Sequence, residues 1–402
     1  MIRFLKRKGW IIVLVLFLML FPQSLSSQAR LNNRVLITGL AIDKTAGTYS
    51  VTAQVAMPIA GGEGKPSASF EFVTDSGKTI TEALNKTGYK IGKIAGLSHT
   101  NFIMLGAGVM EDNLIDDLDY FVRDAHLPNS VMIVACEGSA EEEIKKTKSL
   151  ELPVGLALQK VYLFKQDALN SIMVPAHRFV DMAYEPSKVS VVPTIKIEDS
   201  GEGGGQGGQS QGEEKTARLE YITPIKYFKN GVYVDELAGK DEVFAYLVAQ
   251  SFGKSFDMVV NNVDDRSMFF NAEVGLRVGK KATKTSIDFS GFAPKAKITI
   301  DLKDILLLEV NNENGNPSGL LTNSTYVNNQ TLNEAIKGQI SEKIQQVFDK
   351  TKQQNVDLFG FINHAYRFNY GDYKKYIQYN VGEDAFLQNL ELEVEVRVGN
   401  YK

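Results

Sequence analysis

Apolar and polar residues alternate strictly in three segments of the last third of the chain. The apolar positions are Ala272, Val274, Leu276, Val278, Ala296, Ile298, Ile300, Leu302, Leu390, Leu392, Val394, Val396 and Val398. A period of two places these side chains on one face of each strand, which predicts a sheet with one face on a core and one in water, typical of antiparallel sheets. Before the third segment, the capping box Thr331-Leu-Asn-Glu334 begins a long helix that we expect to cover this sheet. Its apolar stripe comprises Leu332, Ile336, Ile340, Ile344 and Val347.

The first third of the chain combines short strands with short helices. Two apolar-rich runs, 35–42 and 48–55, predict a β-hairpin, because the second run alternates apolar and polar residues. Thr79-Ile-Thr-Glu82 and Ser139-Ala-Glu-Glu142 are capping-box patterns that begin two helices. The same reasoning predicts strands at 102–105 and 131–135 and a helix over 115–122.

The middle third contains a hairpin with an over-long loop. The segment 189–197 is strand-like, and its expected partner is 219–228. Asn230-Gly231 then predicts a second, tight hairpin, because both residue types tolerate positive φ angles. Between the two longer strands, residues 201–212 are mostly glycine and glutamine, so we expect a mobile loop there. Helices are expected at 154–165 and 175–182.

The first 29 residues have the layout of a secretory signal. Basic residues between Arg3 and Lys8 precede the apolar run 10–21, and small residues follow it. The twelve apolar residues of that run reach only about 18 Å as a helix, less than the roughly 30 Å of a bilayer core. We therefore expect cleavage after Ala29, with an uncleaved membrane anchor as the alternative. In either case the body of the protein would be extracytoplasmic.

Length and composition indicate a globular protein of several domains. The chain of 402 residues is too long for one small domain, and its 44% hydrophobic and 23% charged residues are typical of folded proteins. The predicted fold class is α+β, a three-domain mixed architecture with largely antiparallel sheets, the last sheet covered by a long helix. We place an N-terminal α/β domain at 30–137, a middle α+β domain at 138–250 with a flexible Gly-rich loop at 201–215, and a C-terminal α+β domain at 251–402.

Charge and cysteine count exclude several classes of function. The formal net charge is −4, and the first 29 residues carry four basic residues and no acid, which leaves −8 on the rest. An acidic body argues against non-specific nucleic-acid binding, which needs Lys and Arg against the phosphates. Cys136 is the single cysteine, so the chain has no internal disulfide and no thiolate zinc site. Because Cys136 follows an apolar strand, we interpret it as an inert, packed thiol.

A search for catalytic and binding motifs yields no reaction. Gly106-Ala-Gly108 follows a strand, as phosphate-binding turns do, but Glu111 stands where a third glycine is needed and, with Asp112, would repel pyrophosphate. Neither Gly-x-Ser-x-Gly nor His-Glu-x-x-His is present. The histidines are far apart in the sequence: His99, His126, His177 and His364. We therefore expect no catalytic, cofactor-binding, metal or lipidation residue, and no cofactor.

Two features keep other functions open. Asp116, Asp117 and Asp119 lie on a helix and are interpreted as a solvated face, although the paired carboxylates of a glycosidase can be distant in sequence. An aromatic-rich stretch is interpreted as packing, with an exposed recognition strip as the alternative; it comprises Tyr366, Phe368, Tyr370, Tyr373, Tyr376 and Tyr379. The alternative functions are therefore a secreted cell-wall hydrolase or a glycan-binding protein.

Four short stretches in a fixed order carry a family resemblance. They are Gly-Leu-Ala-Ile-Asp43-Lys44 with the strand 49–55, Ser98-His99-Thr-Asn-Phe-Ile-Met-Leu-Gly106 with Phe121-Val-Arg123-Asp124, Phe228-Lys229 within 225–237, and Asp357-Leu-Phe-Gly360-Phe361. In this order they resemble the Ger(x)C family, the C subunits of spore germinant receptors in endospore-forming bacteria. Together they span nearly the whole body of the chain.

The chain also departs from the family pattern near both ends. The family normally has a lipobox cysteine followed by Trp-Asp and arginines, whereas this chain has Leu31-Asn-Asn-Arg34. The tryptophans usual near the family's C-terminus are absent, since Trp10 is the only one. The resemblance therefore does not carry diacylglyceryl anchoring over to this chain.

The resemblance implies a three-domain α+β fold with no known catalytic activity. It also implies residence on the outer face of the cell membrane or inner spore membrane, together with integral-membrane A and B type receptor subunits. We therefore expect a non-enzymatic extracytoplasmic subunit of a spore germinant receptor, membrane-associated and without nucleic acid. It would dock on the membrane subunits and support nutrient-triggered germination.

Overall fold

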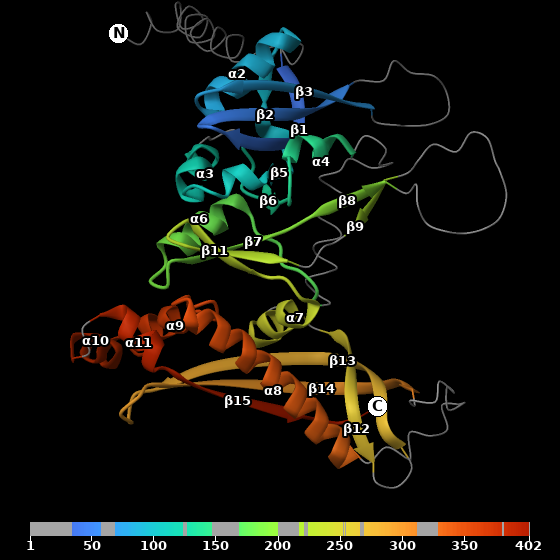
Figure 1. Ribbon diagram of the computed structural model, residues 1–402, viewed down its shortest axis with the longest axis vertical. Coiled ribbons are helices and arrows are strands. Elements are labelled where there is room, and N and C mark those ends of the chain that lie inside the picture. Colours follow the sequence, from blue (N-terminus) through green and yellow to red (C-terminus); the bar gives the residue numbers. More distant parts are fainter. Residues whose placement is uncertain are drawn as a thin grey trace, which may run out of the picture.

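The computed structural model describes most of the chain. The described residues are 34–57, 69–123, 127–146, 169–199, 217–220, 224–251, 253, 255–265, 269–311, 329–379 and 382–401. The predicted leader at 1–29, the helix at 154–165 and the Gly-rich loop at 201–215 lie outside these residues. In Figure 1 the described elements stack in three parts along the long axis, from a blue sheet through a green and yellow one to an orange and red one.

The first part is a mixed sheet in the order β3-β2-β1-β5-β6, with β4 paired to β1. Its strands are β1 Arg34–Thr45, β2 Thr48–Met57, β3 Ser69–Gly77, β4 Ile94–Gly96, β5 Phe102–Leu105 and β6 Met132–Ala135. The β1–β2 pair is the predicted antiparallel hairpin, whereas β5 and β6 run parallel to β1. One face of this sheet buries Leu40 and Ile42 in the main core, and the other buries Phe102 and Met104 in a second core.

Three helices accompany this sheet: α2 Ile80–Ile91, α3 Leu114–Arg123 and α4 Ala140–Lys146. Helix α2 begins as its capping box predicts, because the Thr79 hydroxyl accepts a hydrogen bond from the backbone N–H of Glu82 at 3.1 Å. It ends at Gly92, whose φ of 68° lies in the left-handed region that glycine adopts without strain.

Helix α4 is capped by two side chains, of which the sequence spacing predicts only one. The predicted cap Ser139 is present, but its hydroxyl lies 3.4 Å from the backbone nitrogen of Glu142. The closer acceptor is the Asp43 carboxylate of β1, which accepts from the backbone N–H groups of Ala140 at 2.8 Å and Glu141 at 2.9 Å. A residue 97 positions earlier in the chain therefore fixes the start of α4.

The middle part contains a three-stranded sheet in the order β11-β10-β7. Its elements are α6 Ala176–Tyr184, β7 Val189–Pro193, β10 Ile225–Lys229 and β11 Val232–Leu237. Strand β10 pairs antiparallel with both neighbours, and the predicted Asn230-Gly231 turn joins it to β11. Helix α6 packs on this sheet through Phe179, whose ring meets that of Phe228 edge to face at 5.4 Å.

The predicted partner strand 219–228 divides into two strands. Residues 225–229 form β10, while β9 (Ala217–Glu220) pairs with β8 (Lys196–Asp199) in a separate two-stranded sheet. Ile195 and Ile197 leave the middle sheet and join the second core beneath the first sheet. The first and middle parts therefore share a core.

The last part is a four-stranded sheet in the order β12-β13-β14-β15. Its strands are β12 Phe256–Asp265, β13 Phe269–Asp288, β14 Lys295–Asn311 and β15 Glu391–Val398. The long helix α8 (Asn329–Gln353) covers it as predicted, but it begins before the predicted cap, so that Thr331 lies inside the first turn. The five stripe residues from Leu332 to Val347 are at most 2% exposed. The predicted α+β class with largely antiparallel sheets is confirmed.

The last strand differs from the antiparallel pattern, because β15 pairs parallel with β14. The reason is topological, since the chain between these strands crosses the face of the sheet in helices and re-enters at the same end. After α8 these helices are α9 Phe361–Phe368, α10 Tyr370–Tyr379 and α11 Glu383–Asn389.

A lysine joins the middle part to the last sheet at the end of helix α7 (Lys240–Ala249). The ammonium of Lys281 on β13 donates to the carbonyl oxygens of Val248 at 3.1 Å and Gln250 at 2.5 Å. A cation at this position is favoured by the carbonyl groups that a helix C-terminus leaves free. Burial lowers the pKa of Lys281 to about 8.

None of the helices in the described part of the chain has the length and apolar character that a membrane span requires.

Candidate functional site

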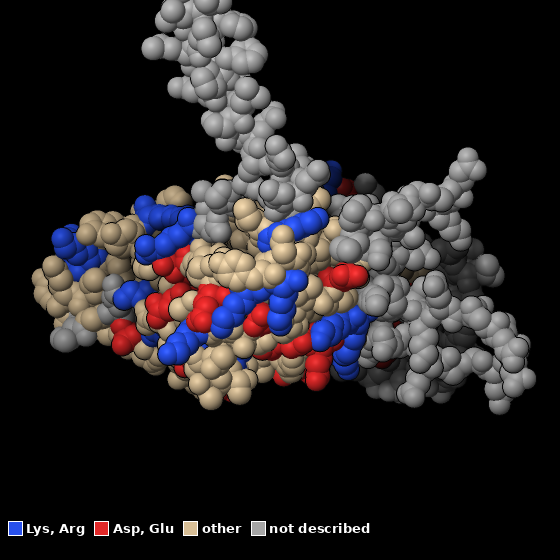
Figure 2. Space-filling view, turned by 90° about the horizontal axis from the view of Figure 1, so that it is seen from above, with Lys and Arg blue, Asp and Glu red and all other residues tan. Residues whose placement is uncertain are grey.

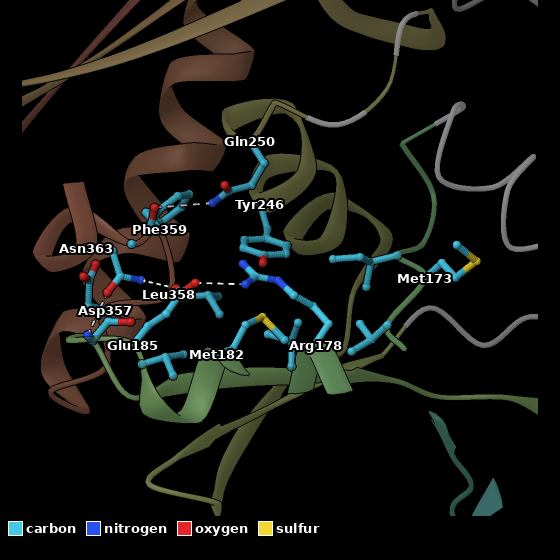
Figure 3. Close-up of a pocket in the computed structure, with 16 residues that line it drawn as sticks. Met173, Arg178, Met182, Glu185, Tyr246, Gln250, Asp357, Leu358, Phe359 and Asn363 are labelled. Atoms are coloured by element: carbon cyan, nitrogen blue, oxygen red, sulfur yellow. Dashed lines mark hydrogen bonds and ion pairs between the residues drawn. The ribbon is translucent and has the colours of Figure 1, made fainter. Parts of the chain in front are cut away.

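The most elaborate polar arrangement lies at the seam between the middle part and the C-terminal helices. We call this place the seam. It holds a cavity of about 190 Å³, lined by α6, β7, α7 and the segment 357–363 (Figure 3). Elements from both halves of the chain meet here, so the seam determines how the middle sheet and the last sheet are held together.

Glu185, at the end of α6, is the hub of the seam. Its carboxylate accepts from the Arg178 guanidinium at 2.9 Å and from the Asn363 amide of α9 at 2.7 Å. The Arg367 guanidinium lies 3.6 Å from the same carboxylate. Asn363 completes the bridge, because its amide oxygen accepts from the backbone N–H of Ser187 at 2.8 Å. Figure 3 shows Arg178, Glu185 and Asn363 converging on the cavity.

Asp357 is the buried carboxyl of the seam. It precedes α9 and accepts from the backbone N–H groups of Phe361 at 2.9 Å and Ile362 at 2.6 Å. Gly360 has a φ of 75°, which turns the chain so that these N–H groups face the carboxylate. Burial raises the pKa of Asp357 to about 6, because loss of hydration outweighs the hydrogen bonds that favour the charged form.

Aromatic rings form the wall of the seam behind these polar groups. Tyr246 of α7 lies 6.3 Å from Phe359, ring centre to ring centre, and Phe359 stacks on Phe361 at 5.8 Å. Phe348 at the end of α8 meets Phe361 edge to face at 5.9 Å. Burial raises the pKa of Tyr246. The wall is therefore apolar, and the Asp357 side chain beside it is buried.

A second cavity, of about 370 Å³, lies on the other side of Asp357. Lys229 of β10 donates to the backbone carbonyl of Asn355 at 2.7 Å and lies 3.6 Å from the Asp384 carboxylate of α11. The Asn355 amide donates to the same carboxylate at 2.5 Å. These contacts again connect the middle sheet with the C-terminal helices.

The charged groups of the seam are engaged with other protein groups. Glu185 bonds to Arg178, and Asp357 accepts from backbone N–H groups. The residues that line the first cavity include neither histidine nor cysteine. No described lining residue therefore forms a nucleophile and base pair of the kind that acyl transfer or hydrolysis uses. What the geometry does show is that α6 and the middle sheet are joined to the C-terminal helices.

Of the residues singled out in the sequence, those that lie at the seam are Lys229, Asn230, Asp357, Gly360 and Phe361. Gly106 lies against Asp43, and a Cβ there would come within 2.0 Å of the Asp43 carboxylate. Asp112 pairs with Lys44 at 2.9 Å rather than facing a phosphate. Cys136 is buried, and burial raises the pKa of its thiol to about 12.

The histidines lie apart from one another, at different elements of the fold. His99 is in a short 3₁₀ turn, His177 in α6, and His364 in α9 with its ring 4.7 Å from that of Phe368. His126 is outside the described residues. No group of three His, Cys, Asp or Glu side chains in the described part of the chain could hold a metal ion. Sequence reasoning missed Glu185 and Asn363, which are ordinary polar residues 178 positions apart.

In a comparison with known proteins, two family models match the two halves of the chain. The model of the spore germination protein N-terminal domain matches residues 27–197. The model described as spore germination B3/GerAC like, C-terminal, matches residues 225–399. The two matches lie in the order in which the resemblance motifs occur.

Two relatives are similar over different lengths. Spore germination protein B3 of Bacillus subtilis (strain 168) is 34% identical over 113 residues, which are 27% of this chain and 29% of that protein. The protein of the crystal structure of GerBC aligns with a TM-score of 0.47 and 17% identity, over 90% of this chain and 97% of that one. With both family models matched in order, the chain belongs to the Ger(x)C family of spore germination proteins.

Proposed function

We propose that this protein is a non-enzymatic, extracytoplasmic subunit of a spore germinant receptor, which docks on integral-membrane A and B type subunits. The observation that carries the proposal is the ordered match of both family models, which together span most of the body. The signal-like pattern of the first 29 residues supports the outer face of a membrane as its place.

The seam suggests how such a subunit would act. Hydrogen bonds and ion pairs tie the middle sheet to the C-terminal helices at Glu185, Asn363 and Lys229. A body whose parts are held at a fixed angle presents one defined surface to a membrane partner. By binding one conformation of that partner more tightly than another, it would shift the populations of the receptor's states.

The test is a clean deletion in a strain without a paralogue, with germination followed after a nutrient trigger and after a non-nutrient trigger. We expect the deletion to slow germination by nutrients only, and complementation with the full chain to restore it. In parallel, the tagged full chain is purified from detergent-solubilised membranes, and we expect integral-membrane receptor subunits to accompany it.

Two results would overturn the proposal. One is nutrient germination that proceeds at the normal rate in the deletion strain. The other is turnover of cell-wall fragments by the purified protein, which would favour the hydrolase alternative. Turnover would have to be lost in carboxylate variants to count as the protein's own activity.

A further inference from the structure

An exposed aromatic surface lies at one end of the last part of the molecule. We call it the aromatic end; it comprises Phe292, Tyr366, Phe368, Tyr370 and Tyr379. Phe292 is fully exposed in the turn between β13 and β14, and Phe368 and Tyr379 are 72% and 86% exposed. Figure 1 places this turn and α10 together at the left of the molecule.

Packing beneath the surface makes the aromatic end one continuous feature. Phe289, which precedes the turn, lies 6.2 Å from Tyr376 of α10 and 5.9 Å from Phe386 of α11. Tyr366 of α9 meets Tyr370 of α10 edge to face at 5.1 Å. The turn and both helices are therefore held side by side, and the exposed rings project from a rigid base.

Basic side chains accompany these rings. Lys374 and Lys375 of α10 and Arg367 of α9 are exposed, and Arg367 also faces Glu185; the exposed acids here are Asp372 of α10 and Asp288, which ends β13 before the turn. Neither lysine has an ion pair with another described residue, and the Lys374 ammonium lies 5.8 Å above the Tyr370 ring. Figure 2 shows blue atoms among tan ones at the left end, on a chain whose net charge is −4.

We propose that the aromatic end docks on the surface of an anionic lipid bilayer. Tyrosine and phenylalanine rings settle at the level of the lipid headgroups, and lysines are attracted to negatively charged lipids. Lysine is depleted in the cores of protein interfaces, so its presence among the rings favours lipid over a protein partner. The surface also lies at one side of the last part of the molecule (Figure 1), and none of its five rings lines either seam cavity.

The inference deepens the proposed function, because it gives the body a second contact with the membrane. Its test needs only the purified full chain and vesicles, so its failure leaves the proposed receptor role to be judged separately. Phe368→Trp is the probe, and Tyr184→Trp on α6, where Tyr184 is 75% exposed, is the matched control. The native Trp10 is common to both variants and is subtracted.

Vesicles contain phosphatidylglycerol with phosphatidylcholine, or phosphatidylcholine alone, with brominated acyl chains that quench nearby tryptophan. We expect quenching of the tryptophan at position 368 in anionic vesicles only, and none at position 184. In the 368 probe, Lys374→Ala with Lys375→Ala should weaken the contact about 25-fold, since each lysine near the surface contributes about fivefold. Lys303→Ala with Lys337→Ala, two exposed lysines elsewhere, should change it less than twofold.

Three results would overturn the inference. The first is no quenching at position 368 in anionic vesicles, which would mean that the aromatic end contacts a protein partner or water and not lipid. The second is equal quenching at positions 184 and 368, which would show that the leader merely holds the body near the lipid. The third is equal quenching in neutral vesicles or after removal of the two lysines.

Discussion

Asp357 holds the start of helix α9 from a position that water does not reach. Its carboxylate accepts from two backbone N–H groups, at 2.9 and 2.6 Å, and Asp357 lines both seam cavities. The nearest cation with an electrostatic effect on it is Lys229 of β10. The protonation state of this one side chain therefore bears on the contact between the middle sheet and the C-terminal helices.

Replacing Asp357 with asparagine should change how stability depends on pH. The folded-state pKa of Asp357, about 6, lies above the roughly 3.9 of an unfolded aspartate. The stability that the protonated side chain contributes is therefore present below about pH 4 and is lost as the pH rises through 6. Asparagine does not titrate. We expect the unfolding free energy of Asp357→Asn, relative to the wild type, to rise by about 2 kcal/mol between pH 4 and pH 8.

Urea unfolding at several pH values measures this difference. Asp372→Asn, which alters an exposed carboxylate on α10, is the control and should show no such trend. A difference between Asp357→Asn and the wild type that stays constant with pH would contradict the assignment.

Asp43 should stabilise helix α4 by accepting hydrogen bonds from its first turn. Asp43→Ala removes the acceptor of the Ala140 and Glu141 N–H groups and of the Ser139 hydroxyl, which lies 3.1 Å away. We expect the unfolding free energy to fall by about 1–2 kcal/mol in urea titrations. Ser139→Ala should cost less, because its bond to the Glu142 nitrogen is long at 3.4 Å. Equal losses in the two variants would mean that Ser139 is the main cap.

At the scale of elements, the sequence pattern predicts those strands and helices whose formation depends on residues close together in the chain. The alternation around Ile298 and the stripe around Ile340 predict the last sheet and its covering helix, because each pattern has a single period. The direction of β15 depends on where the preceding helices cross the sheet, and no residue in the strand encodes it. The same holds for the seam, where Glu185 meets Asn363 through the fold alone.

The Asn230-Gly231 turn gives a prediction about one of these elements. Gly231 has a φ of 79°, its carbonyl accepts from the backbone N–H of Leu114 at 2.9 Å, and a Cβ there would come within 2.2 Å of the Asn113 side chain. Gly231→Ala should therefore lower the unfolding free energy by about 1–3 kcal/mol, through backbone strain and this close approach.

Asn230→Gly provides the matched control for this turn, because residue 230 has a φ of 54° that glycine adopts freely. Its effect on the midpoint of thermal unfolding should be small. If Gly231→Ala melts at the wild-type temperature, the turn does not pack on α3 as described.

At the scale of the whole molecule, the seam is one of several places where polar contacts join the middle part to the last part. Asn363 contributes two of these bonds, one to Glu185 and one to the Ser187 backbone. Lys229 adds an independent connection to Asn355 and Asp384. Other contacts join the same parts, because Gln354 bonds to the Tyr227 hydroxyl and Lys350 of α8 donates to the Glu236 carbonyl, so the coupling is shared among many side chains.

Asn363→Ala should loosen the contact between α6 and α9 before it unfolds the middle or the last part. It leaves the Ser187 N–H without its acceptor and removes a bond to a charged group, so we expect a loss of about 2–3 kcal/mol. Hydrogen exchange should show faster opening of α9 and the end of α6, with the core of the first sheet unchanged. Asn85→Ala, at an exposed position on α2, is the control. Uniformly faster exchange across the molecule would argue against a separable joint.

The parallel return of β15 has a consequence for biosynthesis. A nascent chain that ends before Glu391 contains β14 with the edge that β15 pairs along residues 295–302 still bare. Bare edges of this kind recruit strands from other molecules. Ribosome-bound or prematurely terminated chains should therefore require chaperone protection until the last strand has been synthesised.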